Sequence, residues 1–158
     1  MSQQRELAGL LDREAIADLI YAYCHHFDLN EPEAVAALFS EDATVDYGPE
    51  APTITGGRAA IGPAIAIGLA NTFAATSHHV SNVRIELEGP DRARSVSYLY
   101  AWHRYVDGSP DGELWARYLH RFVRTPEGWR ISELVLQAAG MHEFHRATMH
   151  PIGRRPVR

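Results

Sequence analysis

Hydrophobic residues recur with helical spacing in the first part of the chain. Between Asp12 and Phe27, the apolar side chains fall three or four positions apart. They are Ile16, Leu19, Ile20, Tyr23 and Phe27. This spacing predicts one helix with a single buried face.

Two further helices and a short strand are predicted before residue 75. Asn30 is placed to cap a short helix with Pro32 in its first turn. The inner face of this helix is expected to be Val35, Leu38 and Phe39. A short strand is predicted over 43–47. A third helix is expected over 58–73, in which a break near the proline at position 63 is an alternative.

The second part of the chain alternates between apolar and polar positions, as strands do. Four strands are predicted, over residues 79–88, 92–106, 113–125 and 129–139. Each is separated from the next by a short turn that contains glycine or proline. Consecutive strands with short turns form an antiparallel meander. The chain is therefore predicted to be an α+β domain with its helices on one face of the sheet.

The chain has the length of one domain, with 158 residues and no repeat or linker to divide it. We expect one domain over residues 1–140 and a C-terminal extension over 141–158. Pro151, Gly153 and Pro156 argue against a long helix in the extension. Three alternatives stay open for it: closing a pocket, packing on a partner subunit, or disorder.

Charge and composition exclude several classes of function. The net charge of −5 offers no basic face for a nucleic acid, because the only basic concentration is the terminal Arg154, Arg155 and Arg158. Cys24 is the single cysteine, which excludes an intrachain disulfide and a cysteine-based zinc site. Residues 1–10 lack a signal-peptide pattern, and no apolar run approaches the ~20 residues that span a bilayer. We expect a cytoplasmic protein without membrane or nucleic-acid partners.

An aspartate and a pair of histidines are the first candidates for chemistry. Asp28 ends the first predicted helix, where the helix dipole disfavours a negative charge. It is either a solvated loop carboxylate or one aimed at an interior partner. His78 and His79 open a strand, and only one of them can face inward. Because His79 shares parity with Val83, three alternatives stay open: a bulge between Asn82 and Val83, an inward His79, or a sheet covered on both faces.

A third histidine lies on an apolar strand face. His103 shares parity with Leu99, Ala101 and Tyr105, a set that suits a pocket wall. A lone histidine on such a face is more often a hydrogen-bonded core residue than a catalyst. Beside a carboxylate, however, an imidazole can accept a proton near neutral pH.

The chain contains no motif for a metal or an organic cofactor. A glycine-rich phosphate loop, a nucleophile elbow and a metalloprotease helix are all absent from the sequence. Five other histidines lack a carboxylate at metal-ligand spacing: His25, His26, His142, His145 and His150. We expect neither a metal nor a cofactor.

Several motifs, taken in order, resemble the SnoaL-like branch of the nuclear transport factor 2-like superfamily. They are Phe27-Asp28, Leu38-Phe39-Ser40-Glu41-Asp42, Val45-Asp46-Tyr47, Gly57-Arg58-Ala59-Ala60-Ile61, His78-His79-Val80-Ser81-Asn82, Phe122-Val123-Arg124 and Gly128-Trp129-Arg130-Ile131. The resemblance covers roughly residues 14–136. It implies a cone-shaped curved sheet, mixed or antiparallel, with three N-terminal helices that enclose one pocket.

Within that fold, the motifs are nearest to those of scytalone dehydratase, bile-acid 7α-dehydratase and hexachlorocyclohexane dehydrochlorinase. The resemblance places the catalytic histidine of these enzymes on His78 and their aspartate on Asp28. The second histidine of the scytalone enzyme falls on His103, and its pocket tyrosine falls on Tyr47. Tyr23 matches a tyrosine of the bile-acid enzyme, five residues before the aspartate.

The resemblance does not assign one particular substrate to this chain. Phe27 stands where the scytalone enzyme has a tyrosine, so the substrate-shaping residues form a mixture. The implied activity is a cofactor-independent lyase that eliminates water, or another small leaving group, from a cyclic or polycyclic apolar substrate. In it, Tyr23 or Tyr47 donates a hydrogen bond to a substrate carbonyl, and His103 protonates the departing hydroxyl.

Other candidates complete the predicted site. The expected substrate-binding residues are Tyr47, Phe27, Asn82, Trp102, Trp115 and Tyr118, although core packing would also explain most of the aromatic ones. The alternatives are isomerase or polyketide-cyclase chemistry in the same pocket, a ligand carrier, or a structural subunit. Apolar residues on both faces of the predicted sheet indicate a homo-oligomer, a dimer or a trimer.

Overall fold

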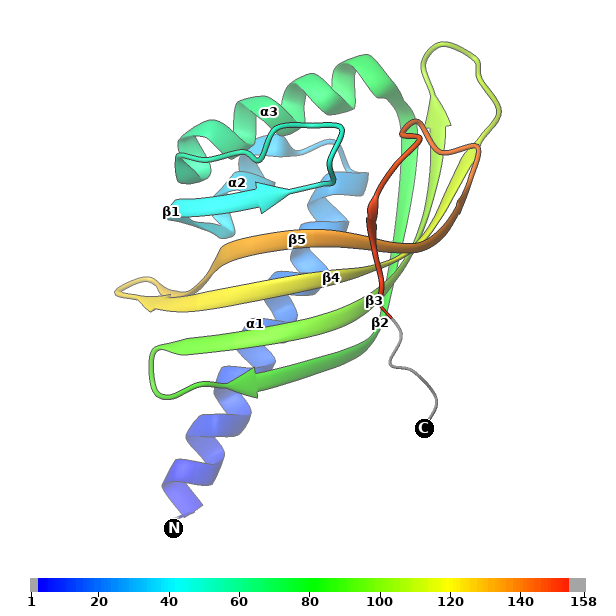
Figure 1. Cartoon of the computed structure of the whole chain (residues 1–158). Coiled ribbons are helices and arrows are strands. Elements are labelled where there is room, and N and C mark those ends of the chain that lie inside the picture. Colours follow the sequence, from blue (N-terminus) through cyan, green and yellow to red (C-terminus); the bar gives the residue numbers. More distant parts are fainter. Residues whose placement is uncertain (1–2, 154–158) are drawn as a thin grey trace, which may run out of the picture.

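The computed structural model describes residues 3–153 and has the predicted order of helices followed by strands (Figure 1). The helices are α1 (Gln3–Asp28), α2 (Pro32–Ala37) and α3 (Gly57–Thr72). The strands are β1 (Phe39–Asp46), β2 (Phe73–Leu87), β3 (Arg92–Tyr105), β4 (Gly112–Thr125), β5 (Gly128–His142) and β6 (His150–Pro151). The predicted tail residues Arg154, Arg155, Pro156 and Arg158 lie outside the described residues.

The strands form one curved, unclosed mixed sheet. Its order is β1-β5-β4-β3-β2, with β6 added beside β5. The meander from β2 to β5 is antiparallel, whereas β1 and β6 each pair with β5 in parallel. Figure 1 shows α1 crossing behind the meander and α3 lying beside β1. The α+β class and the curved mixed sheet are therefore confirmed.

The core lies between the helices and the inner face of the sheet. Along α1 the buried residues are Ile16, Ile20, Tyr23 and Cys24. The first three belong to the predicted stripe, whose other members Leu19 and Phe27 are partly buried. The helix begins well before Asp12, but its first turns expose Leu7, Leu10 and Leu11. This extension gives no buried stripe for a periodicity argument to detect. In the part of the chain that the structure describes, no helix combines the length and apolar character that crossing a bilayer requires.

The short helix differs from its prediction at both ends. Asn30 adopts a left-handed φ of 59°, so it belongs to the tight connection, and Glu31 stands at the N-cap position. Leu38 follows the last helical residue, and Phe39 already begins β1. The backbone amide of Ile131 on β5 donates to the Leu38 carbonyl. Pairing with the sheet therefore ends the helix earlier than its apolar pattern suggests.

Helix α3 runs without a break through Pro63. Proline removes one backbone hydrogen bond, yet this helix packs closely on α2. A Cβ at Gly62 would lie only 3.2 Å from the Cβ of Ala36. Close packing between the two helices thus outweighs the local preference for a break.

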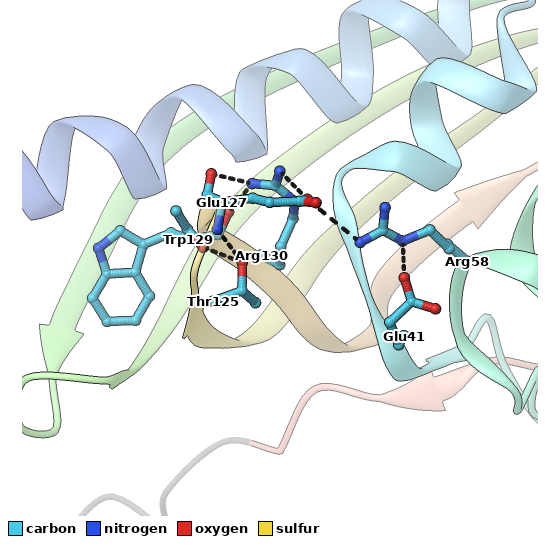
Figure 2. Close-up of polar contacts among 7 residues, drawn as sticks. Glu41, Arg58, Thr125, Glu127, Trp129 and Arg130 are labelled. Carbon is cyan, nitrogen blue, oxygen red and sulfur yellow. Dashed lines mark hydrogen bonds and ion pairs between the residues drawn. The ribbon is translucent and has the colours of Figure 1, made fainter.

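A small ion-pair cluster fastens the end of the sheet where β4 turns into β5. Figure 2 shows Arg58 of α3 reaching Glu41 of β1 and Glu127 of the turn, with Arg130 joining Glu127. The nitrogen–oxygen distances are 3.2, 3.9 and 3.1 Å. Because Glu41 and Glu127 are largely exposed, the cluster adds little stability. The opposite end of β5 leads into residues 143–152, several of which line a cavity.

Candidate active site

A cavity of about 450 Å³ lies at that opposite end, between the sheet, α1, α3 and the chain that follows β5. Its volume falls in the usual range of about 300–1,000 Å³ for small-molecule pockets. Its apolar wall includes Phe27, Ile54, Ile65, Phe73, Leu114 and Leu136. Its polar groups are few: Tyr23, Tyr47, His78, His103, Tyr118, His145 and Arg146. An apolar space with a few polar groups suits a small, largely hydrophobic molecule.

His78 and Asp28 meet at the wall of this cavity. The Nδ1 atom of His78 lies 2.6 Å from Oδ1 of Asp28, although 50 residues separate them along the chain. The His78 side chain is 6 % exposed and lines the cavity. With Nδ1 held by the carboxylate, Nε2 is the ring nitrogen left to meet a ligand.

The carboxylate of Asp28 accepts three hydrogen bonds from β2. Besides His78 Nδ1, the donors are the backbone amide of His78 to Oδ2 at 2.8 Å and the Thr76 hydroxyl to Oδ1 at 2.7 Å. Burial alone would raise the pKa of Asp28, but the hydrogen bonds from His78 and Thr76 hold this pKa below its ordinary value. Asp28 is therefore a charged, fixed partner for the imidazole.

A bulge in β2 decides which histidine faces inward. The pairing with β3 shifts register between Ser81 and Arg84, and Asn82 has a left-handed φ of 50°. The shift reverses the alternation, so His78 faces the cavity while Val83 still packs on the core. His79 points away and is exposed. Of the three alternatives left by the sequence, the bulge is the one that occurs.

His103 is close to His78 but has no carboxylate. Their ring centres lie 5.5 Å apart, and Phe73, Phe144 and His145 surround His103 on its other sides. Burial, together with the positive charges that neighbouring histidines can carry, lowers the pKa of His103 to about 3. At neutral pH its imidazole is uncharged. This differs from the expected role of His103 as proton donor to a leaving group, because a neutral imidazole lacks the second, acidic N–H proton of an imidazolium.

Two tyrosines form a hydrogen-bonded pair across the cavity floor. The hydroxyls of Tyr23 and Tyr47 are 2.6 Å apart, and the ring of Tyr118 packs edge-on against Tyr23. Burial raises the pKa of Tyr47 to about 12, and it also raises the pKa of Tyr23 well above its ordinary value. Both therefore remain protonated at neutral pH. One hydroxyl donates to the other, and the second O–H stays available to a ligand.

Residues 143–152, which we name the C-terminal strap, close one side of the cavity. β5 continues past the predicted boundary at residue 140, and the strap then turns back over Phe73 and Tyr47. Phe144, His145 and Arg146 of the strap line the cavity. Among the alternatives for the extension, the described part takes the pocket-closing one.

Several hydrogen bonds hold the strap. Tyr105 donates its hydroxyl to the Glu143 carbonyl at 3.1 Å and accepts from the backbone amide of His145 at 3.0 Å. Glu50 accepts from the backbone amide and hydroxyl of Thr148 at 2.6 and 2.7 Å. His150 lies 2.9 Å from Asp46 and belongs to β6, which pairs with β5. The strap is thus part of the folded domain.

Three expected substrate-binding residues lie outside the cavity. Trp102 alternates with Ala101 and His103 on β3, so its ring is on the outer face, where Arg104 stacks on it. Trp115 is also on the outer face and is 45 % exposed. Asn82 occupies the bulge on that face. These assignments were wrong because strand parity separates both tryptophans from the inward residues. Phe27, Tyr47 and Tyr118 do line the cavity.

Sequence reasoning missed several residues at the site, among them Thr76, His145 and Arg146. Thr76 bonds Asp28, and its signal was its position two residues before His78 on the same strand face. Arg146 lines the cavity from the strap, and nothing in the local pattern of an irregular segment indicates that placement. In residues 3–153, no group of three His, Cys, Asp or Glu side chains is placed to hold a metal ion.

A curved sheet and three helices around one apolar pocket define a small-molecule-binding domain of the nuclear transport factor 2-like class. A model of the SnoaL-like domain family matches residues 8–135, which is most of the chain. The chain belongs to the SnoaL-like family.

Solved structures agree with this assignment. The chain is similar to a scytalone dehydratase-like protein from Novosphingobium aromaticivorans, with 34% identity over 94% of this chain and 98% of that one, and a TM-score of 0.86. A protein from Kribbella flavida is 25% identical over 85% of this chain and 95% of its own, with a TM-score of 0.77. A type 2 hexachlorocyclohexane dehydrochlorinase is 20% identical over 94% and 97% of the two chains, with a TM-score of 0.81, which shows the shared fold alone. No curated protein matches the chain significantly.

Proposed function

We propose that this protein is a cofactor-independent lyase that removes water, or another small leaving group, from a cyclic apolar substrate. The observation that carries the proposal is the contact of His78 with Asp28 at the wall of an apolar cavity. Similarity to a scytalone dehydratase-like protein adds support from outside the site. In this proposal His78 is the general base, and Asp28 orients it.

The first step is removal of a proton from a carbon beside a substrate carbonyl. Asp28 fixes Nδ1 of His78 as the protonated nitrogen, which leaves the lone pair on Nε2 to accept the proton. The electrons of the broken C–H bond move onto the carbonyl oxygen and form an enolate. Tyr23 or Tyr47 donates a hydrogen bond to that oxygen. The charged Asp28 stabilises the imidazolium that results.

The second step is loss of the leaving group. As the enolate reforms its carbonyl, the neighbouring C–O bond breaks and a double bond forms between the two carbons. The proton held on Nε2 of His78 passes to the departing oxygen, which leaves as water. His103 is uncharged at neutral pH, so in this scheme it contributes a hydrogen bond to the leaving group rather than its proton.

Isomerase and cyclase chemistry would use the same base and return the proton elsewhere. Product mass separates these reactions, because dehydration lowers the mass by one water whereas isomerisation leaves it unchanged. A structural subunit would be expected to have a filled pocket, and neither it nor a ligand carrier requires the contact between His78 and Asp28. Here the cavity is about 450 Å³ and the two side chains are bonded.

The test is turnover of a panel of hydroxylated cyclic and polycyclic ketones by wild type, His78→Ala and His79→Ala. Loss of a general base costs roughly 10²–10⁴-fold in rate, so His78→Ala should lose at least a hundredfold. His79→Ala is the matched control, because this neighbouring histidine is exposed outside the cavity, and it should keep full activity. Equal activity of all three proteins would reject the assignment of His78.

The expected homo-oligomer stays a prediction. The outer face of the sheet carries Tyr98 and Trp115, which are 43 % and 45 % exposed in the single chain. Burial of these aromatic rings would favour a second copy on this face. Sedimentation of the purified protein measures the subunit number directly.

A further inference from the structure

Arg146 is the one guanidinium among the residues that line the cavity. It enters from the strap, beside Tyr47, and its side chain is half-buried. Its Nη1 donates to the backbone carbonyl of Tyr47 at 2.6 Å, and its guanidinium carbon lies 5.9 Å from the Tyr47 ring centre. Among the residues that line the cavity, which include no Asp, Glu or Lys, Arg146 is therefore the one with a permanent charge.

The charge of Arg146 has no direct carboxylate partner. Within residues 3–153, no Asp or Glu oxygen lies within 4 Å of its nitrogens, although an arginine offers five N–H donors. The hydrogen bond to Tyr47 uses one of them. A half-buried cation is costly unless an opposite charge or several acceptors satisfy it.

The two acids close enough to influence Arg146 are occupied elsewhere. Asp46 is bonded by His150 at 2.9 Å and by the backbone amide of Gly48 at 2.9 Å. Glu50 is bonded by Thr148 and the backbone amide of Ala147. Burial lowers the pKa of Arg146, and Tyr47, Glu50 and Asp46 offset this effect only in part. The remaining donors are therefore free for a ligand.

The position of Arg146 relative to His78 sets the orientation of such a ligand. Contacts along the cavity wall run from Arg146 to Tyr47, from Tyr47 to Tyr23, from Tyr23 to Phe27 and from Phe27 to His78. A second set of contacts leads from His78 through His103 to His145, the neighbour of Arg146, so both residues line the same cavity. A molecule held at one end by Arg146 would extend its rings toward His78.

We infer that Arg146 is a specificity-determining residue that binds a carboxylate on the substrate, so the preferred substrates are cyclic apolar acids. A carboxylate matches the paired N–H groups of a guanidinium and can accept two hydrogen bonds at once. Turnover of such acids rests on the proposed lyase function, whereas their binding beside Arg146 does not. The competing explanation is that Arg146 only fastens the strap to Tyr47.

Binding of two probes of equal shape separates these explanations. We would measure the dissociation constants of 2-naphthoate and the uncharged 2-naphthamide by calorimetry, for wild type, Arg146→Gln, Arg146→Lys and Tyr105→Phe. Tyr105→Phe is the matched control: it removes two strap hydrogen bonds without a change of charge, and Tyr105 itself does not line the cavity.

The expected result is that wild type binds naphthoate at least tenfold more tightly than naphthamide. Arg146→Gln should weaken naphthoate by about 10- to 100-fold, as loss of a charge-assisted bond predicts, and leave naphthamide nearly unchanged. The affinity of Arg146→Lys for naphthoate should fall between those of wild type and Arg146→Gln, since lysine keeps the charge but lacks the paired N–H groups of a guanidinium. Tyr105→Phe should change both probes by the same factor, whatever its size.

Three results would overturn the inference. They are equal affinities of wild type for both probes, an equal loss of both probes in Arg146→Gln, and no binding of naphthoate to wild type at millimolar concentration. The outcome does not depend on turnover. His78→Ala should keep the preference for naphthoate even if the lyase assignment fails, so the two proposals can fail separately.

Discussion

Two histidines on the inner face of the sheet have opposite surroundings. His78 on β2 lies against Asp28 and borders an open cavity. His120 on β4 is 2 % exposed and lies opposite Ser95 of β3, with the rings of Tyr118 and Phe122 beside it. Neither ring nitrogen of His120 has a hydrogen-bond partner in the described part of the chain.

The comparison separates burial from function. Burial without a partner lowers the pKa of His120 to about 3, so its ring is neutral at pH 7 and has no acid beside it. His78 has a carboxylate to stabilise its charged form and a cavity that a substrate can enter. His103 is intermediate, since it lines the cavity but has no acid. A buried histidine therefore indicates a base only when both a partner and an open space are present.

The largest effect on turnover is expected when His78 loses its carboxylate partner. Asp28→Asn keeps the shape but loses the charge, and its one accepting oxygen cannot satisfy all three donors that now meet the two carboxylate oxygens. We expect at least about a hundredfold loss of turnover, because the imidazolium and its tautomer are no longer stabilised. Circular dichroism and the thermal midpoint show whether the fold is kept. Full activity in a folded variant would show that Asp28 is not needed by the base.

A second prediction concerns the pH dependence of stability at His120. The folded protein keeps this ring neutral down to a pH of about 3, whereas the unfolded chain takes up a proton near pH 6.5. The unfolded state binds more protons between these values, so stability is lost as the pH falls from about 6.5 toward 3. His120→Leu should lose about 2 kcal/mol less than wild type between pH 7 and pH 5.

Urea unfolding at the two pH values measures this difference. His79→Leu serves as the control, since His79 is exposed, and it should follow the wild-type curve. Parallel curves for wild type and His120→Leu would mean that His120 is satisfied in the folded state.

At neutral pH, His120→Leu should raise the free energy of unfolding by about 1 kcal/mol. Leucine has a similar volume and removes two buried nitrogens that lack partners. The same replacement at His78 should abolish turnover. Activity of His120→Leu should stay at the wild-type level, and a loss of activity would give His120 a role that its surroundings do not predict.

The smallest expected effect is at Thr76. Thr76→Val keeps the shape and removes one of the three bonds to Asp28. A single hydrogen bond contributes about 1 kcal/mol, so turnover should fall by only about two- to fivefold. Ser77→Ala, at the next position of the strand, should have no effect on turnover. A decrease as large as that of Asp28→Asn would make Thr76 part of the reacting group itself.

Residue patterns within single helices and strands account for the part of the fold and the site that the sequence predicted. The end of α1 at Asp28, the inward apolar stripe and the antiparallel meander from β2 to β5 follow from residue spacing and short turns. The parallel pairing of β1 and β6 with β5 does not. The resemblance to the SnoaL-like family then predicted that Asp28 and His78 belong to one site. The positions of Trp102 and Trp115 could also have been read correctly, because their parity is opposite to that of His103.

The sequence alone determined the class of fold and the residues that could act as base and partner, since periodicity and motifs are properties of nearby positions. Only the tertiary structure decided that His78 faces inward, that Thr76 bonds Asp28 and that Arg146 enters the cavity. The bulge at Asn82 depends on pairing between β2 and β3, and the strap is held by Glu50, Tyr105 and β5. These contacts join residues far apart in the chain, so no local pattern contains them.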